Sequence, residues 1–366
     1  MKRIDLFRPT LGASELAAIR EIFESGWIGY GPRCEGVERA WSFEVGAKYG
    51  IATNSCTSAL QIALKLRNVG PGDQVIVPAI TFAATAEAVV AVGATPIFCD
   101  VDPQTLLIDP LSACEKQTAK TKAVIPVLYA GQPLDIGNTF HGMDVIYDCA
   151  HAAGSSFNAA GKLCCWSFQA VKNLGCGDGG MVTTDSQTDQ IRGKAIAWHG
   201  IDRSTWSRAV GRHYSWEYEV SEVGIKGQMN DITAAILSVQ IGRMGEMQAA
   251  RRTIACQYYR ELQGVPIVGD WVESHRSAWH LFVIKSPQRN KLADYLAEQG
   301  IITGVHYKPL HLHPAYRGAG SLPVAEAEWQ KVLSLPMHIG LSVADVTRIC
   351  EAVQSFNQAH QIKEAA

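Results

Sequence analysis

The stretch "CCWSFQAVKNLGCGDGG" (164–180) decides how the fold is interpreted. Its tail (175–180) satisfies the pattern G-x-G-x-x-G, which in a dinucleotide-binding turn follows a strand and opens a helix. Here the glycines lead into the strand-like run "MVTTD" (181–185), and they lie deep in the chain rather than at its first β–α turn. We therefore interpret them as a flexible turn between two strands that follows Lys172, in preference to a dinucleotide site.

Short β-branched runs alternate with helical patterns upstream of this turn. Strands are expected at 74–79, 95–102, 122–131, 143–150 and 179–185. A helix of small residues, closed by Gly93, lies between the first two strands. Because β-α-β alternation is typical of a largely parallel sheet with helices on both faces, we expect an α/β fold.

The C-terminal part of the chain has a different pattern. A long amphipathic helix is expected over residues 231–262, with Gly242 and Gly245 as kink positions. Beyond it the patterns predict strand, helix, strand and helix over residues 277–285, 289–300, 301–307 and 342–356. We therefore expect two domains, a large one over residues 1–245 and a smaller α+β one over residues 246–366.

Composition limits the possible classes of protein. The 366 residues are 47% hydrophobic and 19% charged, an ordinary globular balance. The net charge of −2 gives no basic excess that would favour nucleic acid or an anionic membrane surface. We find no signal-peptide pattern and no membrane span. The ten cysteines are scattered without a C-x-x-C pair, so we expect a cytoplasmic protein with reduced thiols and no metal site.

Two titratable side chains suggest chemistry. Lys172 lies among small and apolar residues with no acidic neighbour before Asp178, and a desolvated lysine becomes a usable amine nucleophile. Asp148 ends an apolar strand, so its carboxylate should point into the crevice at the carboxyl edge of a parallel sheet. Pyridoxal phosphate (PLP) needs such an acid beside its ring nitrogen. Capping of a helix is the alternative role for Asp148.

Two further segments fit the same cofactor. "TNSCTSALQIALKL" (53–66) passes from a polar cluster into an apolar-periodic helix. The N-terminal N–H groups of this helix, with the hydroxyls of Ser55 and Thr57, could cradle a phosphate. Phe82 follows a strand and opens a helix beside the same crevice, where its ring could stack on a pyridine. Ordinary capping by Asn54 or Ser55, and a place in the core for Phe82, are the structural alternatives.

Together these features make the sequence resemble the sugar aminotransferases of the DegT/DnrJ/EryC1/StrS family, which are PLP-dependent enzymes of fold type I. The resemblance covers nearly the whole chain. Its most specific parts are "YDCAHAAG" (147–154), "SFQAVKNLGCGDGG" (167–180), "VHYKPLHLHPAY" (305–316) and the segment 68–109. It implies a large, mostly parallel-sheet domain with a smaller C-terminal α+β domain, and it assigns the glycine-rich turn to the loop of Lys172.

The resemblance also implies roles for matching positions. Lys172 would form a Schiff base with PLP, and Asp148 would pair with the ring nitrogen. His151 would lie near the phenolic oxygen of the cofactor, and Phe82 would stack on its ring. In a homodimer with shared sites, the phosphate would be bound by Cys56, Thr57, Ser167 and the partner subunit's Lys226. A solvated surface position is the alternative for that lysine.

The implied substrates are L-glutamate as amino donor and a nucleotide-linked keto-sugar as acceptor. Segments 198–209 and 216–220 resemble relatives that aminate C4 of UDP- or dTDP-linked 4-keto-sugars. The substrate side would be lined by Tyr30, His306, Tyr307 and His311. A 3-keto-6-deoxysugar nucleotide or a keto-inositol is the alternative acceptor, and a non-catalytic PLP-binding regulator is the alternative function.

Overall fold

The computed structural model describes residues 2–364, apart from residues 135, 138, 204, 205, 207, 209–215, 270–273, 317 and 319. Part of the segment 198–209, which carries the expectation of C4 amination, therefore lies outside the described residues. The strands are β1 (Tyr49–Thr53), β2 (Gln74–Pro78), β3 (Thr95–Cys99), β4 (Thr121–Val124), β5 (Asp144–Asp148), β6 (Leu163–Ser167), β7 (Gly180–Thr184), β8 (Phe282–Lys285) and β9 (Val332–Leu335).

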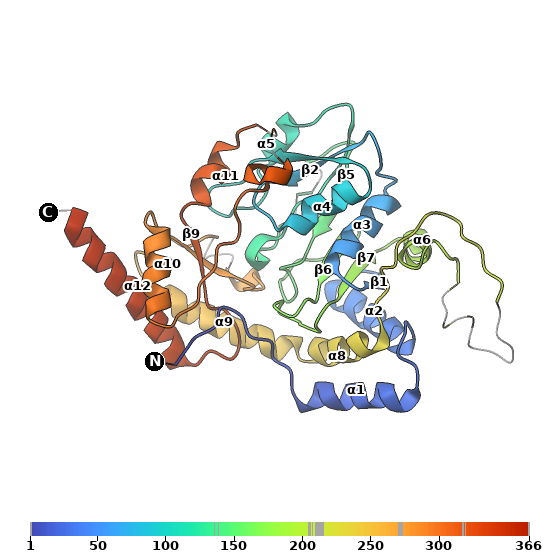
Figure 1. Ribbon diagram of the computed structural model, residues 1–366, viewed down its shortest axis with the longest axis horizontal. Coiled ribbons are helices and arrows are strands. Elements are labelled where there is room, and N and C mark those ends of the chain that lie inside the picture. Colours follow the sequence, from blue (N-terminus) through green and yellow to red (C-terminus); the bar gives the residue numbers. More distant parts are fainter. Residues whose placement is uncertain are drawn as a thin grey trace.

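The α-helices complete the architecture (Figure 1). In the described part of the chain they are α1 (Ala13–Ser25), α2 (Pro32–Val45), α3 (Cys56–Leu66), α4 (Ala83–Ala91), α5 (Pro110–Glu115), α6 (Gln187–Ala197), α8 (Asp231–Gly242), α9 (Met244–Glu261), α10 (Arg289–Glu298), α11 (Pro323–Glu328) and α12 (Val343–Glu364). None of them has the length and apolar character needed to cross a membrane.

Seven strands form one mixed sheet in the order β1-β7-β6-β5-β4-β2-β3. The strands from β6 to β3 in this order are parallel neighbours, while β7 runs antiparallel to both β6 and β1. The expected α/β fold with a mostly parallel sheet is thus confirmed. Because β6 and β7 are antiparallel, the loop between them reverses the chain, as expected for the glycine-rich turn.

Helices cover both faces of this sheet (Figure 1). Alternate side chains of β6 point to opposite layers, with Leu163 and Cys165 in one buried cluster and Cys164 and Trp166 in the other. Helix α3 packs against β5, β6 and β7, whereas α2 packs against β1 and contacts α8. A strand that is buried on both faces does not show a polar–apolar alternation, which is why β6 is apolar up to its last residue, Ser167.

The C-terminal part builds a second, smaller sheet from the antiparallel strands β8 and β9. Its buried cluster contains side chains of α9, α10 and α12 and, from the N-terminal end of the chain, Ile4. The expected long helix is two helices, because α8 ends at Gly242 and α9 begins at Met244. Gly245 lies inside α9 and marks no kink. The domain boundary at residue 245 stays a prediction.

Each expected strand is shorter than predicted or absent, and three differ most from the expectation. The run 122–131 keeps strand structure only to Val124, because Pro126 has no N–H to donate and Ala130 adopts a left-handed backbone with φ 59°. The run 277–285 is a strand only over β8, since Trp279 also has a positive φ of 48°. The run 301–307 makes only isolated bridges to two different partners, and it is not a strand.

Candidate active site

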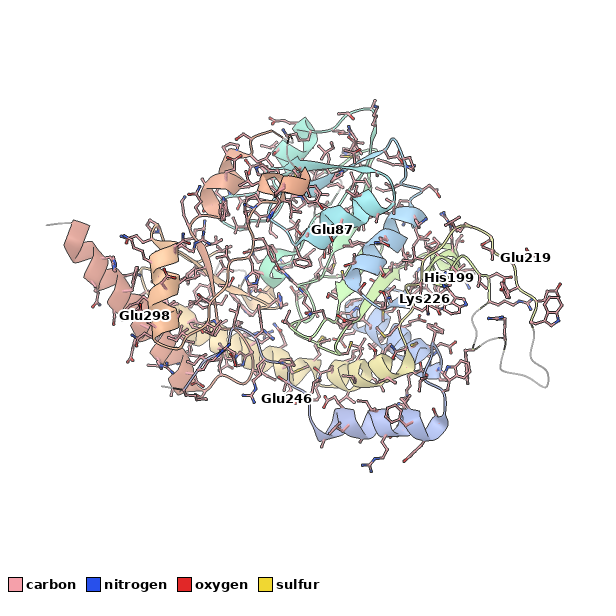
Figure 2. The ribbon with its side chains drawn as sticks, in the orientation of Figure 1. Glu87, His199, Glu219, Lys226, Glu246 and Glu298 are labelled. Atoms are coloured by element: carbon pink, nitrogen blue, oxygen red, sulfur yellow. The ribbon has the colours of Figure 1, made fainter. Side chains whose placement is uncertain are left out.

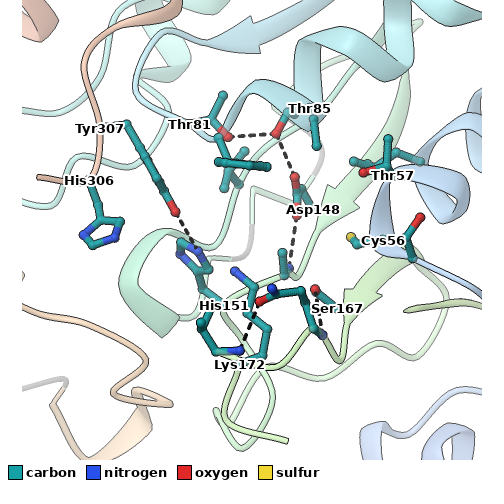
Figure 3. A pocket seen from close by; sticks show the side chains of 18 of the residues that line it. Cys56, Thr57, Thr81, Thr85, Asp148, His151, Ser167, Lys172, His306 and Tyr307 are labelled. Carbon is teal, nitrogen blue, oxygen red and sulfur yellow. Dashed lines mark hydrogen bonds between the residues drawn. The ribbon is translucent and has the colours of Figure 1, made fainter. Parts of the chain in front are cut away.

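A cavity of about 390 Å³ lies where β5 and β6 end, and the N-termini of α3 and α4 reach the same place (Figure 3). Most of the residues expected at the site line this cavity. They are Cys56, Thr57, Phe82, Asp148, His151, Ser167, Lys172, His306 and Tyr307. Such convergence at the carboxyl ends of parallel strands is the usual place for a ligand in an open α/β sheet.

Lys172 lies in the loop between β6 and β7. Backbone hydrogen bonds close this loop, from Phe168 N to Gly179 O (2.8 Å) and from Ala170 N to Gly177 O (2.7 Å). Burial lowers the pKa of Lys172 to about 8, against the opposing influence of Cys56 and Asp148. A large fraction of this amine is therefore neutral near pH 8, as a nucleophile or a proton acceptor must be.

Asp148 is the last residue of β5, and only 4% of its surface is exposed. Its Oδ1 accepts from the backbone N–H of Ala150 at 3.0 Å, and its Oδ2 accepts from the hydroxyl of Thr85 at 2.9 Å. Burial raises the pKa of Asp148, while these hydrogen bonds and Lys172 lower it. The carboxylate is thus held in place, and each oxygen keeps a lone pair for a cationic N–H donor.

The N-terminus of α3 forms one wall of the cavity. Ser55 caps the helix, since its Oγ accepts from the backbone N–H of Ser58 at 3.1 Å. Cys56 and Thr57 are the first helical residues, and first-turn N–H groups attract anions. Strand β7 approaches closely, because a Cβ on Gly180 would lie 2.5 Å from the backbone nitrogen of Cys56. Only glycine fits there, so this residue sets how closely β7 approaches the helix terminus.

Aromatic side chains form the opposite wall (Figure 3). Tyr307 Oη lies 3.3 Å from His151 Nε2, and the Phe82 ring lies 6.0 Å from the Tyr307 ring between centroids. Phe82 is 60% exposed, so the interpretation of this residue as a core phenylalanine is wrong. Burial keeps both histidines of this wall neutral at physiological pH: it lowers the pKa of His306 to about 4 and that of His151 well below its usual range.

Comparison with known proteins identifies the family of this chain. The sequence pattern of the DegT/DnrJ/EryC1/StrS aminotransferase family matches residues 9–354. The chain belongs to this family. The spore coat polysaccharide biosynthesis protein SpsC of Bacillus subtilis (strain 168) is 36% identical over 374 residues, which cover 95% of both chains.

Solved structures of other proteins have the same fold over their whole length. The aminotransferase TlmJ from Streptoalloteichus hindustanus is 35% identical, with a TM-score of 0.89 over 98% of this chain and 100% of that one. Spr1654 from Streptococcus pneumoniae, in its PMP-form, is 28% identical, with a TM-score of 0.91 over 100% of both chains. Spr1654 has also been solved in a PLP-form. These matches confirm the expected enzyme class, a sugar aminotransferase of the DegT/DnrJ/EryC1/StrS family, and PLP as its expected cofactor.

Three of the expected site residues lie outside the cavity of their own chain. Lys226 Nζ lies 4.1 Å from the centre of the Trp198 ring. The hydroxyl of Tyr30 donates to Glu38, at 3.0 Å from Oε1. His311 lies in a short 3-10 helix (Leu310–Leu312), and its Nε2 is 3.1 Å from Oε1 of Glu326 in α11. The structure of a single chain thus assigns no substrate contact to these three residues.

Four buried polar residues around the cavity were not expected from the sequence. The hydroxyl oxygens of Thr81 and Thr85 lie 2.8 Å apart, and the hydroxyl of Thr85 donates to Asp148. Two threonines four residues apart at a strand–helix junction could have predicted that their side chains meet. Asn173 and His280 are hydrogen-bonded to each other at 3.2 Å behind His151. No local pattern links these two, because they are 107 residues apart.

Proposed function

We propose that this enzyme moves an amino group from L-glutamate to a nucleotide-linked keto-sugar, at C4 of a UDP- or dTDP-4-keto-sugar. The observation that carries the proposal is one cavity in which Lys172, with its lowered pKa, and the fixed carboxylate of Asp148 come together. A neutral amine and a buried acid are the two groups that PLP chemistry requires of a protein.

The residues present fit PLP. When bound, the cofactor supplies an aldehyde that condenses with amines and a ring that draws electrons from the adjoining carbon. The first turn of α3 at Cys56 and Thr57, with Ser167 at the end of β6, would hold the phosphate. Asp148 would keep a proton on the ring nitrogen, and the exposed ring of Phe82 would stack on the pyridine.

The remaining residues have roles in orientation and proton transfer. His151 would lie at the phenolic oxygen of the cofactor. Lys172 would hold the cofactor through its amine and then, once displaced, take the α-proton of the amino donor on Nζ. An arginine at this position could do neither, because its guanidinium does not lose a proton at neutral pH.

The proposal includes a homodimer in which the partner subunit's Lys226 reaches the phosphate. Lys226 lies near the base of the segment that projects from the body of the chain, and Glu219 lies farther out on it (Figure 2). Four large hydrophobic side chains among the described residues of this segment are exposed, Trp216 at 76%, Tyr218 at 45%, Val220 at 59% and Val223 at 83%. Apolar groups exposed together on a projection favour a protein partner, and a second copy of this chain is the partner that we propose.

A panel of acceptors tests the sugar. Purified enzyme, PLP and L-glutamate would be incubated with UDP- and dTDP-4-keto-sugars, 3-keto-6-deoxysugar nucleotides and a keto-inositol, and the amino product would be located by NMR. We expect amination at C4, absent from the Lys172→Ala variant. Amination only of the 3-keto-sugar or the keto-inositol would replace the proposed acceptor. Bound PLP with no turnover of any donor would instead support the non-catalytic regulator.

A further inference from the structure

Asn173, the residue after Lys172, is buried with 9% of its surface exposed. Its Nδ2 donates to two backbone carbonyls, Ala153 O at 3.1 Å and Ala278 O at 2.7 Å. Carbonyl oxygens can only accept, so the amide orientation is fixed and Oδ1 is left as an acceptor. The side chain therefore ties the loop of Lys172 to the segment that leads into β8.

His280 is the donor that Asn173 Oδ1 requires. His280 Nδ1 lies 3.2 Å from this oxygen, and the ring is buried with 2% exposed. Because Oδ1 cannot donate, the proton of His280 must sit on Nδ1. Burial lowers the pKa of His280 well below its usual range, and the nearby His151 and Lys172 lower it further. The ring is therefore neutral.

The same segment positions the backbone that faces His151. His280 N donates to Ala130 O at 3.1 Å, and Ala278 N donates to Gly131 O at 2.9 Å. The N–H of Ala130 then donates to His151 Nδ1 at 3.3 Å. His151 therefore accepts at Nδ1, and its proton must sit on Nε2 when the ring is neutral.

This tautomer determines what Tyr307 can do. His151 Nε2 lies 3.3 Å from Tyr307 Oη, as the dashed line between them in Figure 3 shows. Since Nε2 carries the proton, the tyrosine oxygen is the acceptor in this hydrogen bond. The hydroxyl proton of Tyr307 is then available to another acceptor, and Tyr307 lines the cavity.

We propose that Asn173 is a positioning residue that fixes the tautomers of His280 and His151, so that Tyr307 donates its hydroxyl proton to an acceptor atom of the bound ligand. The chain of contacts runs from Asn173 through His280 and the Ala130 peptide to His151. The two imidazole rings are also in contact, with centroids 4.3 Å apart. The inference rests on the proposed function only for the identity of the ligand.

The test is ¹⁵N NMR of the full chain with labelled histidine, recorded with and without PLP, which reads the proton position on each ring nitrogen. His151→Gln and His280→Gln variants assign the signals. We expect a protonated Nε2 on His151 and a protonated Nδ1 on His280, both unchanged through neutral pH. A His151 ring protonated on Nδ1, or averaging between tautomers, would overturn the proposal even if the enzyme transfers amino groups as expected.

An isosteric variant tests the role of Asn173. Asn173→Asp keeps the acceptor for His280, but it loses both donated hydrogen bonds and adds a negative charge. We expect the pKa of His280 to rise by about 1–3 units, and the single tautomer of His151 to be lost. Other titratable groups also lower the pKa of His280, namely His151, Lys172, Arg251 and His306. The shift in the variant is therefore measured against the titration of the wild type.

The matched control is Asn158→Asp, at an exposed turn. Oδ1 of Asn158 accepts a hydrogen bond from Ala160 N at 3.0 Å, and an aspartate oxygen can accept the same bond. This control should leave both histidine spectra unchanged. Histidine spectra that are also unchanged in a folded Asn173→Asp protein would contradict the positioning role. If the variant does not fold, the wild-type tautomers still decide the proposal.

Discussion

The hydroxyl of Thr85 donates to Asp148 Oδ2 at 2.9 Å, and both side chains are buried. A second threonine, Thr81, lies 2.8 Å from the Thr85 hydroxyl and extends the chain. Burial raises the pKa of Asp148, and the hydrogen bond from Thr85 opposes that rise because it stabilises the carboxylate. The acid expected at the cofactor ring thus depends on a residue of α4 that has no direct part in the chemistry.

Replacing Thr85 tests this dependence. Thr85→Val keeps the shape but removes the donor, so the pKa of Asp148 should rise and its pairing with a ring nitrogen should weaken. We expect kcat/KM for L-glutamate to fall about tenfold, the equivalent of one lost hydrogen bond to a charged group. Thr85→Ser retains the hydroxyl and should keep most of the activity. Equal activity of the valine and serine variants would show that the hydrogen bond is unimportant.

Lys172 should lower the stability of the chain when no cofactor is bound. Its pKa is about 8 in the folded chain, below the ordinary lysine value of 10.5, so the unfolded chain binds more protons between these two pH values. The free energy of unfolding therefore rises as pH increases from 8 to 10.5. Below pH 8 the buried lysine is charged in the folded chain, and the folded chain is destabilised to the full extent.

The variant Lys172→Met should stabilise the cofactor-free protein by about 2–3 kcal/mol at neutral pH. Urea unfolding at pH 7 and at pH 10 measures the effect. The gain should shrink markedly at the higher pH, where the lysine is neutral in the folded chain and is close to its pKa of 10.5 in the unfolded chain. A gain of the same size at both pH values would mean that the methionine acts through packing alone.

Gly180 controls the close approach of β7 to the first turn of α3. The Cβ of Gly180→Ala would meet Cys56 N at 2.5 Å, so the helix terminus must shift, at a cost of about 1–3 kcal/mol. We expect the Kd for PLP to rise by about tenfold or more, measured by fluorescence titration. Gly242→Ala is the control, since its Cβ would meet nothing within 4 Å. An unchanged Kd in Gly180→Ala would exclude this terminus as the phosphate site.

Mixing two impaired variants tests the shared site. If the partner subunit's Lys226 binds the phosphate, then Lys226→Ala alone should weaken the retention of PLP. A heterodimer of Lys172→Ala and Lys226→Ala chains would still contain one intact site. Statistical mixing should then restore about a quarter of the sites. No restoration, with sedimentation showing that heterodimers form, would place Lys226 in its own chain or outside the site.

The sequence was sufficient to predict the central site because the relevant residues follow strands. Asp148 ends β5 and Lys172 follows β6, and the carboxyl ends of parallel strands meet at one edge of a sheet. Strand β1 was not expected, and β6 was expected only as the strand before the glycine-rich turn, without a residue range. β6 has no β-branched residue, and tryptophan is its only residue with a high strand preference, so the strand signal there is weak.

Side-chain direction was the part that the sequence could not provide. Tyr30 and His311 occur in segments that resemble the family, yet each is hydrogen-bonded to a nearby glutamate outside the cavity. Asn173 and His280 meet only after the chain has folded. Tertiary packing decides these contacts, and no local spacing rule encodes them.

The most direct test of the central claim is the visible absorption spectrum of the purified protein with added PLP, before and after L-glutamate, for the wild type and for Lys172→Ala. The account predicts a band of lysine-bound cofactor in the wild type that L-glutamate bleaches, and neither the band nor the change in the variant. A wild-type protein that forms no band, or a band that L-glutamate leaves unchanged, would contradict it.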